Sequence, residues 1–147
     1  MEEFTIRGGG DFLSLTLREV HGFPNSLGSW GGYDAYADIK IKVGGFRVSS
    51  TLYTSTAELS EFCTQLIKCN EQLSGVVRYT SCEGDLEFTA EYDLLGHVSI
   101  KGIFSEQTGF DNKLRFDFRT DQSYIQATIV EMKRLVARYG GMEGVGT

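Results

Sequence analysis

Hydrophobic and polar residues alternate along much of the first third of the chain. The alternation runs through residues 13–17 and again through residues 35–43. A period of two places one row of side chains in the interior and the other in solvent, as in an antiparallel strand. A further alternation over residues 46–52 follows Gly44 and Gly45, so this glycine pair predicts a tight hairpin.

The hydrophobic period changes after residue 55. Ser55 and Glu58 have the spacing of a capping box, in which each side chain accepts a hydrogen bond from a backbone amide at a helix start. A helical stripe then follows at spacings of three and four, through Leu59, Phe62, Cys63, Leu66, Cys69 or Asn70, and Leu73. We predict an amphipathic helix over about 56–73, ended by Gly75 in a left-handed conformation.

Strand patterns return after this helix, over residues 76–80, 86–92, 98–102 and 114–118. Thr120 or Asp121 is then placed to cap a second helix. The predicted buried face of that helix comprises Ile125, Ile129, Met132, Val136 and Tyr139. We expect the helix to end at Gly140 and Gly141.

The order of these elements predicts the fold class. We expect one α+β domain over residues 1–140, in the order ββββ-α-ββββ-α, and a disordered tail over residues 141–147. Strands that are close in sequence pair as meanders, so about eight strands form a curved antiparallel sheet. Two amphipathic helices are expected to pack on one face or one end of it.

Composition narrows the class of protein. A chain of 147 residues with 41% hydrophobic residues can form a core without disulfides. Its acidic start and its lack of an apolar run of about 20 residues predict no secretory signal and no membrane span. The three cysteines and the net charge of −6 favour a cytoplasmic protein that does not bind nucleic acid and suits a basic protein partner.

Candidate catalytic chemistry centres on one hairpin. His97 follows a glycine turn, and Asp93 lies across that turn. The inward positions of the next strand place His97 on the solvent side. Two interpretations stay open: His97 pairs with Asp93 or the turn backbone and stabilises the hairpin, or the pair acts in catalysis. Neither the histidines nor the cysteines have a metal-binding spacing, so we expect no metal site. We also expect no cofactor, and we assign no catalytic residue while both interpretations of His97 stay open.

Two groups of residues are candidates for partner binding. The acids Glu83, Asp85, Glu87 and Glu91 cluster in sequence and suit a basic partner. The loop from His21 to Asp34 carries Phe23, Trp30 and Tyr33 among small polar residues, a mixture typical of binding loops with aromatic anchors. The alternative for Trp30 is that its ring packs inward and closes the end of the core.

The order of several short segments resembles a known family. These segments are DAYADIKIKV, ELSEF, DLEFTAEYD, GHVSIKG, LRFDF and DQSYI. Together they cover the chain from about Phe12 to Tyr139 and resemble the WapI-type family of bacterial immunity proteins and related small uncharacterised bacterial domains. The strongest local match is the stretch from Asp93 to Val98, followed by Asp121 and Gln122.

The resemblance implies a function in protein binding. It implies a non-enzymatic cytoplasmic antidote that neutralises a cognate toxin domain, with no catalytic residues to transfer. The residues alone leave two alternatives: an enzyme that uses His97 and Asp93, or a small-molecule binder whose aromatic sheet interior encloses a ligand. They leave the oligomeric state open.

Overall fold

The computed structural model describes residues 2–145. Within this range the elements follow the predicted order of four strands, a helix, four strands and a helix. In chain order they are β1 (Glu3–Gly8), β2 (Asp11–Val20), β3 (Asp34–Val43), β4 (Phe46–Ser55), α1 (Thr56–Gln72), β5 (Val76–Thr80), β6 (Leu86–Tyr92), β7 (His97–Ser105), β8 (Lys113–Asp121) and α2 (Gln122–Tyr139).

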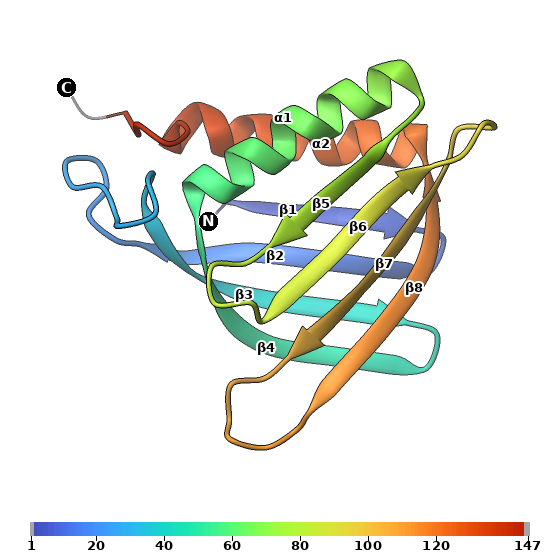
Figure 1. Ribbon diagram of the computed structural model, residues 1–147, viewed down its shortest axis with the longest axis horizontal. Coiled ribbons are helices and arrows are strands. Elements are labelled where there is room, and N and C mark those ends of the chain that lie inside the picture. Colours follow the sequence, from blue (N-terminus) through green and yellow to red (C-terminus); the bar gives the residue numbers. More distant parts are fainter. Residues whose placement is uncertain (1, 146–147) are drawn as a thin grey trace.

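The strands of residues 2–145 form two four-stranded antiparallel sheets, with the orders β1-β2-β3-β4 and β5-β6-β7-β8. The predicted α+β class, antiparallel pairing and element order are confirmed. The boundary between the two sheets coincides with α1, which separates β4 from β5 in the chain. Figure 1 shows the sheets facing each other with crossing strands, while α1 and α2 lie side by side along one end.

The hydrophobic core lies between the two sheets and under the helices. The inward rows of both sheets are buried, as their alternation predicts. At its centre the Phe62 ring packs edge-on against Tyr79 and Phe88, with ring centroids 5.8 and 5.3 Å apart. Edge-on aromatic pairs add to the stabilisation that burial of apolar area already supplies. Aromatic side chains thus fill the interior beneath α1.

The helices cover strand edges that would otherwise expose unpaired backbone groups. The Thr5 amide in β1 donates to the Glu131 carboxylate at 3.0 Å, and the Thr128 hydroxyl donates to the Thr5 carbonyl at 2.7 Å. These bonds fix α2 along the edge of β1. On the other sheet, α1 packs along β5 and against α2. Among the described residues, neither helix has the length and apolar character needed to cross a membrane.

The predicted N-terminal caps are confirmed. Ser55 and Glu58 form the reciprocal capping box of α1, and Asp121 accepts hydrogen bonds from two amides in the first turn of α2. The prediction that Gly75 ends α1 is wrong. Leu73 is the left-handed C-cap, with φ 53°, and its amide donates to the Cys69 carbonyl, so the last turn closes two residues earlier.

Residues 141–145, which follow α2, return to the loop between β2 and β3. Residues 141–145 belong to the predicted tail, and residues 146 and 147 lie outside the described residues. The Gly144 amide donates to the Gly141 carbonyl at 3.1 Å, which makes a turn directly after α2. Both segments lie at the same end of the molecule as the start of α1, while the β6–β7 hairpin lies at the opposite end (Figure 1).

Candidate functional site

The loop between β2 and β3 is folded onto the end of the chain. The His21 amide donates to the Asp34 carbonyl at 2.8 Å, and the Gly32 amide donates to the Met142 carbonyl at 2.7 Å. Gly32 has φ 60°, and a Cβ added there would lie 2.6 Å from the Ala57 amide nitrogen. Glycine is therefore needed where the loop passes the start of α1.

Two of the three predicted aromatic anchors support this loop from inside. Tyr33 is 0% exposed; its hydroxyl donates to the Pro24 carbonyl at 2.8 Å and accepts from the Val145 amide at 2.9 Å. The Phe23 ring packs edge-on against Tyr33 and Tyr139, with centroid distances of 5.3 and 4.9 Å. A buried hydroxyl with both bonds made is a strong constraint on the surrounding backbone.

The third aromatic residue, Trp30, lies on the surface. Its side chain is 65% exposed, so the alternative in which it closes the end of the core is wrong. Met142, from the segment after α2, is 66% exposed, and a Cβ added to Gly31 would lie 2.5 Å from its Cγ. The loop and the end of the chain thus present two large apolar side chains together.

Trp30 and Met142 border a cleft of about 520 Å³ between the loop, α1 and β5. The cleft combines apolar surface at its base with carboxylates on α1 and one guanidinium on β5. Its remaining lining residues are Ala57, Glu58, Ser60, Glu61, Phe62, Gln65, Arg78, Tyr79 and Thr80. A concave surface with apolar walls and a few polar groups is the usual form of a binding site.

Glu58 contributes a partly buried acidic group to this cleft. Its carboxylate accepts hydrogen bonds from the Ser55 amide at 3.0 Å and the Thr54 hydroxyl at 3.2 Å. Burial raises the pKa of Glu58, and the neighbouring carboxylate of Asp34 adds to this increase. Among the described residues, no Lys or Arg lies within ion-pair distance of Glu58. The site therefore holds a partly buried acid without a compensating cation.

The predicted acidic cluster does not form one surface. Asp85 is buried, and its carboxylate accepts a hydrogen bond from the Gln107 amide group at 2.7 Å. Glu87 and Glu91 lie on the exposed face of β6, whereas Glu83 lies in the turn before that strand. The structure thus places Glu87 and Glu91 on one face of β6, four residues apart, and Asp85 in the interior.

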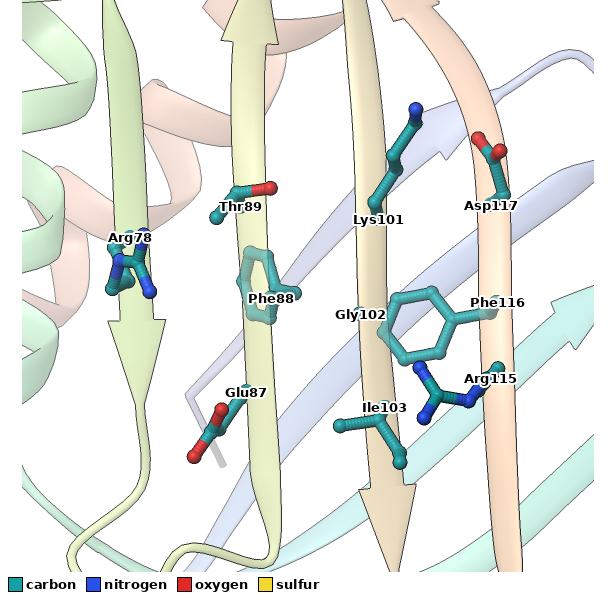
Figure 2. Close-up of a pocket in the computed structure, with 10 residues that line it drawn as sticks. All are labelled: Arg78, Glu87, Phe88, Thr89, Lys101, Gly102, Ile103, Arg115, Phe116 and Asp117. Atoms are coloured by element: carbon teal, nitrogen blue, oxygen red, sulfur yellow. The ribbon is translucent and has the colours of Figure 1, made fainter.

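The exposed face of the β5–β8 sheet mixes both signs of charge. Figure 2 shows the residues around a groove on this face, with Gly102 near its middle. The groove has a volume of about 380 Å³. Cross-strand pairing places Arg78 opposite Thr89, and Lys101 opposite Asp117. Basic and acidic side chains along the groove are Arg78, Lys101, Arg115, Glu87 and Asp117. Glu87 of β6 therefore shares this groove with three basic residues.

The Asp93–His97 pair stabilises its own turn. One carboxylate oxygen of Asp93 accepts from the amides of Leu95 and His97 at 2.8 and 3.0 Å, and the other lies 3.4 Å from His97 Nδ1. These backbone bonds, followed by the charge of His97, lower the pKa of Asp93. A carboxylate used in this way has the structural role expected from the sequence.

Cys63 and Cys82 are poorly suited to nucleophilic chemistry. Burial raises the pKa of Cys63, and burial together with the carboxylates of Glu58 and Glu83 raises that of Cys82 to about 11. Both shifts disfavour the reactive thiolate. Within residues 2–145, no three side chains of His, Cys, Asp or Glu gather closely enough to hold a metal ion.

Sequence reasoning missed the contribution of α1 and the end of the chain. The sequence pattern assigns Glu58 only to a capping box and Met142 only to a tail. Glu61 is the exposed acid one turn further along α1. Its i, i+3 spacing from Glu58 places both on neighbouring positions of one helix face, which is a signal available in the sequence. The contact between Met142 and the loop has no such local signal.

The comparison with known families agrees with this architecture. The model of the Immunity protein WapI-like family matches residues 4–140, which include every strand and helix from β2 to α2 and most of β1. No curated protein matches the chain. The match covers nearly the whole chain, so the protein belongs to the WapI-like family of immunity proteins.

Proposed function

We propose that this protein binds a cognate bacterial toxin domain and neutralises it. The observation that carries the proposal is the family match over residues 4–140, because it spans the whole α+β domain. Immunity by binding needs a stable surface that a toxin recognises, and a rigid two-sheet domain with folded connecting loops provides one. The specific toxin is encoded, in this proposal, by a neighbouring gene.

The proposed mechanism is binding without catalysis. His97 and Asp93 are both about half exposed at the tip of a hairpin, and the carboxylate of Asp93 already accepts two backbone amides. A general base needs a substrate position within hydrogen-bond reach and shielding from water. The turn geometry supports a structural role for this pair.

The proposed compartment is the cytoplasm. Cys63, Cys69 and Cys82 are all free thiols. Free cysteines are usual in a reducing compartment, where disulfides seldom persist. An antidote located there protects the producing cell from toxin that is made or imported in the same compartment.

Co-expression tests the proposal directly. The toxin-like reading frame next to this gene is expressed in cells with and without the immunity protein, and growth and co-purification are measured. We expect restored growth and a stable complex only when both proteins are present. An unrelated small acidic protein expressed at the same level is the control. Unrestored growth together with failure to co-purify would contradict the proposed function.

A further inference from the structure

The cleft between the β2–β3 loop and α1 is bordered by a loop that long-range hydrogen bonds hold in place. Tyr33 ties the loop to both Pro24 and Val145, and Gly32 ties it to Met142. The indole of Trp30 is therefore exposed on a loop that is fixed at several points. Fixing an aromatic residue in advance reduces the conformational entropy lost when a partner binds.

Large apolar side chains of the β2–β3 loop and of the segment after α2 lie exposed beside the cleft. Leu27, Trp30, Met142 and Val145 are each more than 40% exposed, and a Cβ added to Gly144 would lie 2.8 Å from the Leu27 side chain. Tryptophan and methionine are enriched at the centres of protein interfaces. The apolar border of the cleft therefore has the composition of an interface.

The charge of the cleft selects the partner. Glu58 and Glu61 line it from α1, and the carboxylate of Asp34 lies close enough to raise the pKa of Glu58. One carboxylate oxygen of Asp34 is buried without a hydrogen-bond partner. Arg78 is the basic residue of the lining and extends from the opposite wall on β5. The α1 side of the cleft is thus acidic.

We propose that the cleft receives a lysine or arginine side chain of the toxin. The cation lies against the face of Trp30 and pairs with the carboxylates of Glu58 and Glu61. Tryptophan is the most favourable aromatic residue for a cation, and the attraction increases as water is excluded. This inference rests on the proposed function and adds to it the docking surface and the chemistry of the contacting residue.

The other surfaces are less suited to a basic side chain. The groove of the β5–β8 sheet is lined by Arg78, Lys101 and Arg115 together with Glu87 and Asp117, so basic residues outnumber acids there. In the cleft, Arg78 stands opposite the two acids Glu58 and Glu61. The β6–β7 hairpin exposes Leu94 and Leu95, which carry no charge. These two surfaces therefore provide controls.

A fluorine label tests the proposal, because Trp30 is the only tryptophan in the chain. Protein made with 5-fluorotryptophan gives one fluorine NMR signal, and it is titrated with the unlabelled toxin domain identified by co-expression. We expect the signal to shift on binding and to become inaccessible to a soluble paramagnetic quencher. An unchanged signal in a complex that forms would overturn the docking surface.

Affinity measurements separate the aromatic and charged contributions. Trp30→Ala is expected to raise Kd by about 30-fold or more, as at an interface hot spot. Glu58→Gln and Glu61→Gln are expected to weaken binding and its dependence on salt. Leu95→Ala is the apolar control, and Glu71→Gln, on the other end of α1, is the acidic control. Both controls should bind like the wild type.

A double-mutant cycle identifies the toxin residue. Each lysine and arginine of the toxin domain is replaced by alanine and measured against wild type and Glu61→Gln. We expect one basic residue whose effect falls severalfold in the Glu61→Gln background. Unaltered affinity of Trp30→Ala, or a loss confined to Leu95→Ala, would refute the cleft while leaving the immunity function intact. A wild-type protein that binds no toxin would overturn both proposals.

Discussion

The β2–β3 loop and the β6–β7 hairpin both expose large apolar side chains, but they are held in different ways. Asp93 organises the hairpin through bonds to residues two and four positions away, Leu95 and His97. The loop is held by residues far away in the chain, since Val145 bonds to Tyr33. One connection is locally determined and the other depends on the complete fold.

The exposed apolar side chains of the two connections also differ in their surroundings. Leu94 and Leu95 are 100% and 80% exposed at a narrow tip. Trp30 is 65% exposed, but it borders a cleft that is also lined by buried aromatic residues and by carboxylates. Exposure alone therefore does not identify a binding site. An exposed aromatic residue beside a concave, charged surface offers a partner both contact area and selectivity.

The largest expected effect comes from removing the residue that links the loop to the end of the chain. Tyr33→Ala should lower the free energy of unfolding by about 3–5 kcal/mol, because a large, fully buried ring is lost. It also removes the hydroxyl that bonds Pro24 and Val145. Urea denaturation followed by circular dichroism measures the change, with Leu94→Ala on the hairpin tip as the near-neutral control.

A loss below about 1 kcal/mol for Tyr33→Ala would mean that the loop is not part of the cooperative fold. The contrast with the hairpin would then be wrong, because both connections would be held only by residues nearby in the sequence. The variant Tyr33→Phe refines the test, since it keeps the ring and removes only the hydrogen bonds. We expect it to lose about 0.5–1.5 kcal/mol for each bond.

A pair of glycine substitutions gives the second prediction. Gly32 and Gly96 both have positive φ, of 60° and 81°. Alanine at either site should cost about 1–2 kcal/mol for the backbone conformation. At Gly32 its Cβ would also meet the Ala57 amide nitrogen at 2.6 Å, whereas at Gly96 the nearest atom, in Gln122, lies 3.8 Å away. Thermal unfolding should therefore show an additional loss of about 1–3 kcal/mol for Gly32→Ala. Equal losses would contradict this.

The contrast also explains how much could be predicted from sequence. The hairpin depends on Asp93 and Gly96, so its turn and the orientation of His97 follow from local pattern. The capping box at Ser55 and Glu58 is equally local, and so are the alternating strands and the helix faces. These features gave the fold class and element order correctly.

Arrangements that depend on contacts between residues far apart in the sequence could not be predicted. The burial of Tyr33 and the exposure of Trp30 depend on where residues 141–145 return, and no periodicity encodes that return. The sequence pattern places Asp85 among surface acids, because its partner, Gln107, lies 22 residues further along the chain, in the loop between β7 and β8. The division of the strands into two sheets likewise depends on how α1 crosses from β4 to β5.

The third prediction separates stability from binding at the two surfaces. Trp30→Ala and Leu95→Ala should each change the free energy of unfolding by no more than about 0.5 kcal/mol, because both side chains are mostly exposed. Chemical denaturation checks this, and surface plasmon resonance with the toxin domain measures dissociation in parallel. We expect faster dissociation only for Trp30→Ala. A large stability loss for this variant would instead indicate that Trp30 packs in the core.

The smallest effect concerns the ionisation of Glu58. Burial raises its folded-state pKa above the ordinary value of 4.5, so the folded state binds the proton more tightly than the unfolded chain does. The resulting stabilisation is complete below the unfolded pKa and is lost as pH rises through the folded pKa. Glu58→Gln stays neutral at every pH, and its amide oxygen keeps the capping bonds to Ser55 and Thr54.

Glu58→Gln should therefore be slightly more stable than the wild type at pH 7. Its advantage should shrink as pH falls through the folded pKa of Glu58 and should vanish below about 4.5, the ordinary value for glutamate. Denaturation at a series of pH values measures this difference, with Glu61→Gln as the control for removing an exposed charge from the same helix. A Glu58→Gln protein that is less stable at neutral pH would mean that the carboxylate stabilises the fold through its charge. The Glu58 anion would then already be stabilised in the free protein and would not depend on a cation from the partner. The pH series therefore tests the electrostatic argument for the cleft.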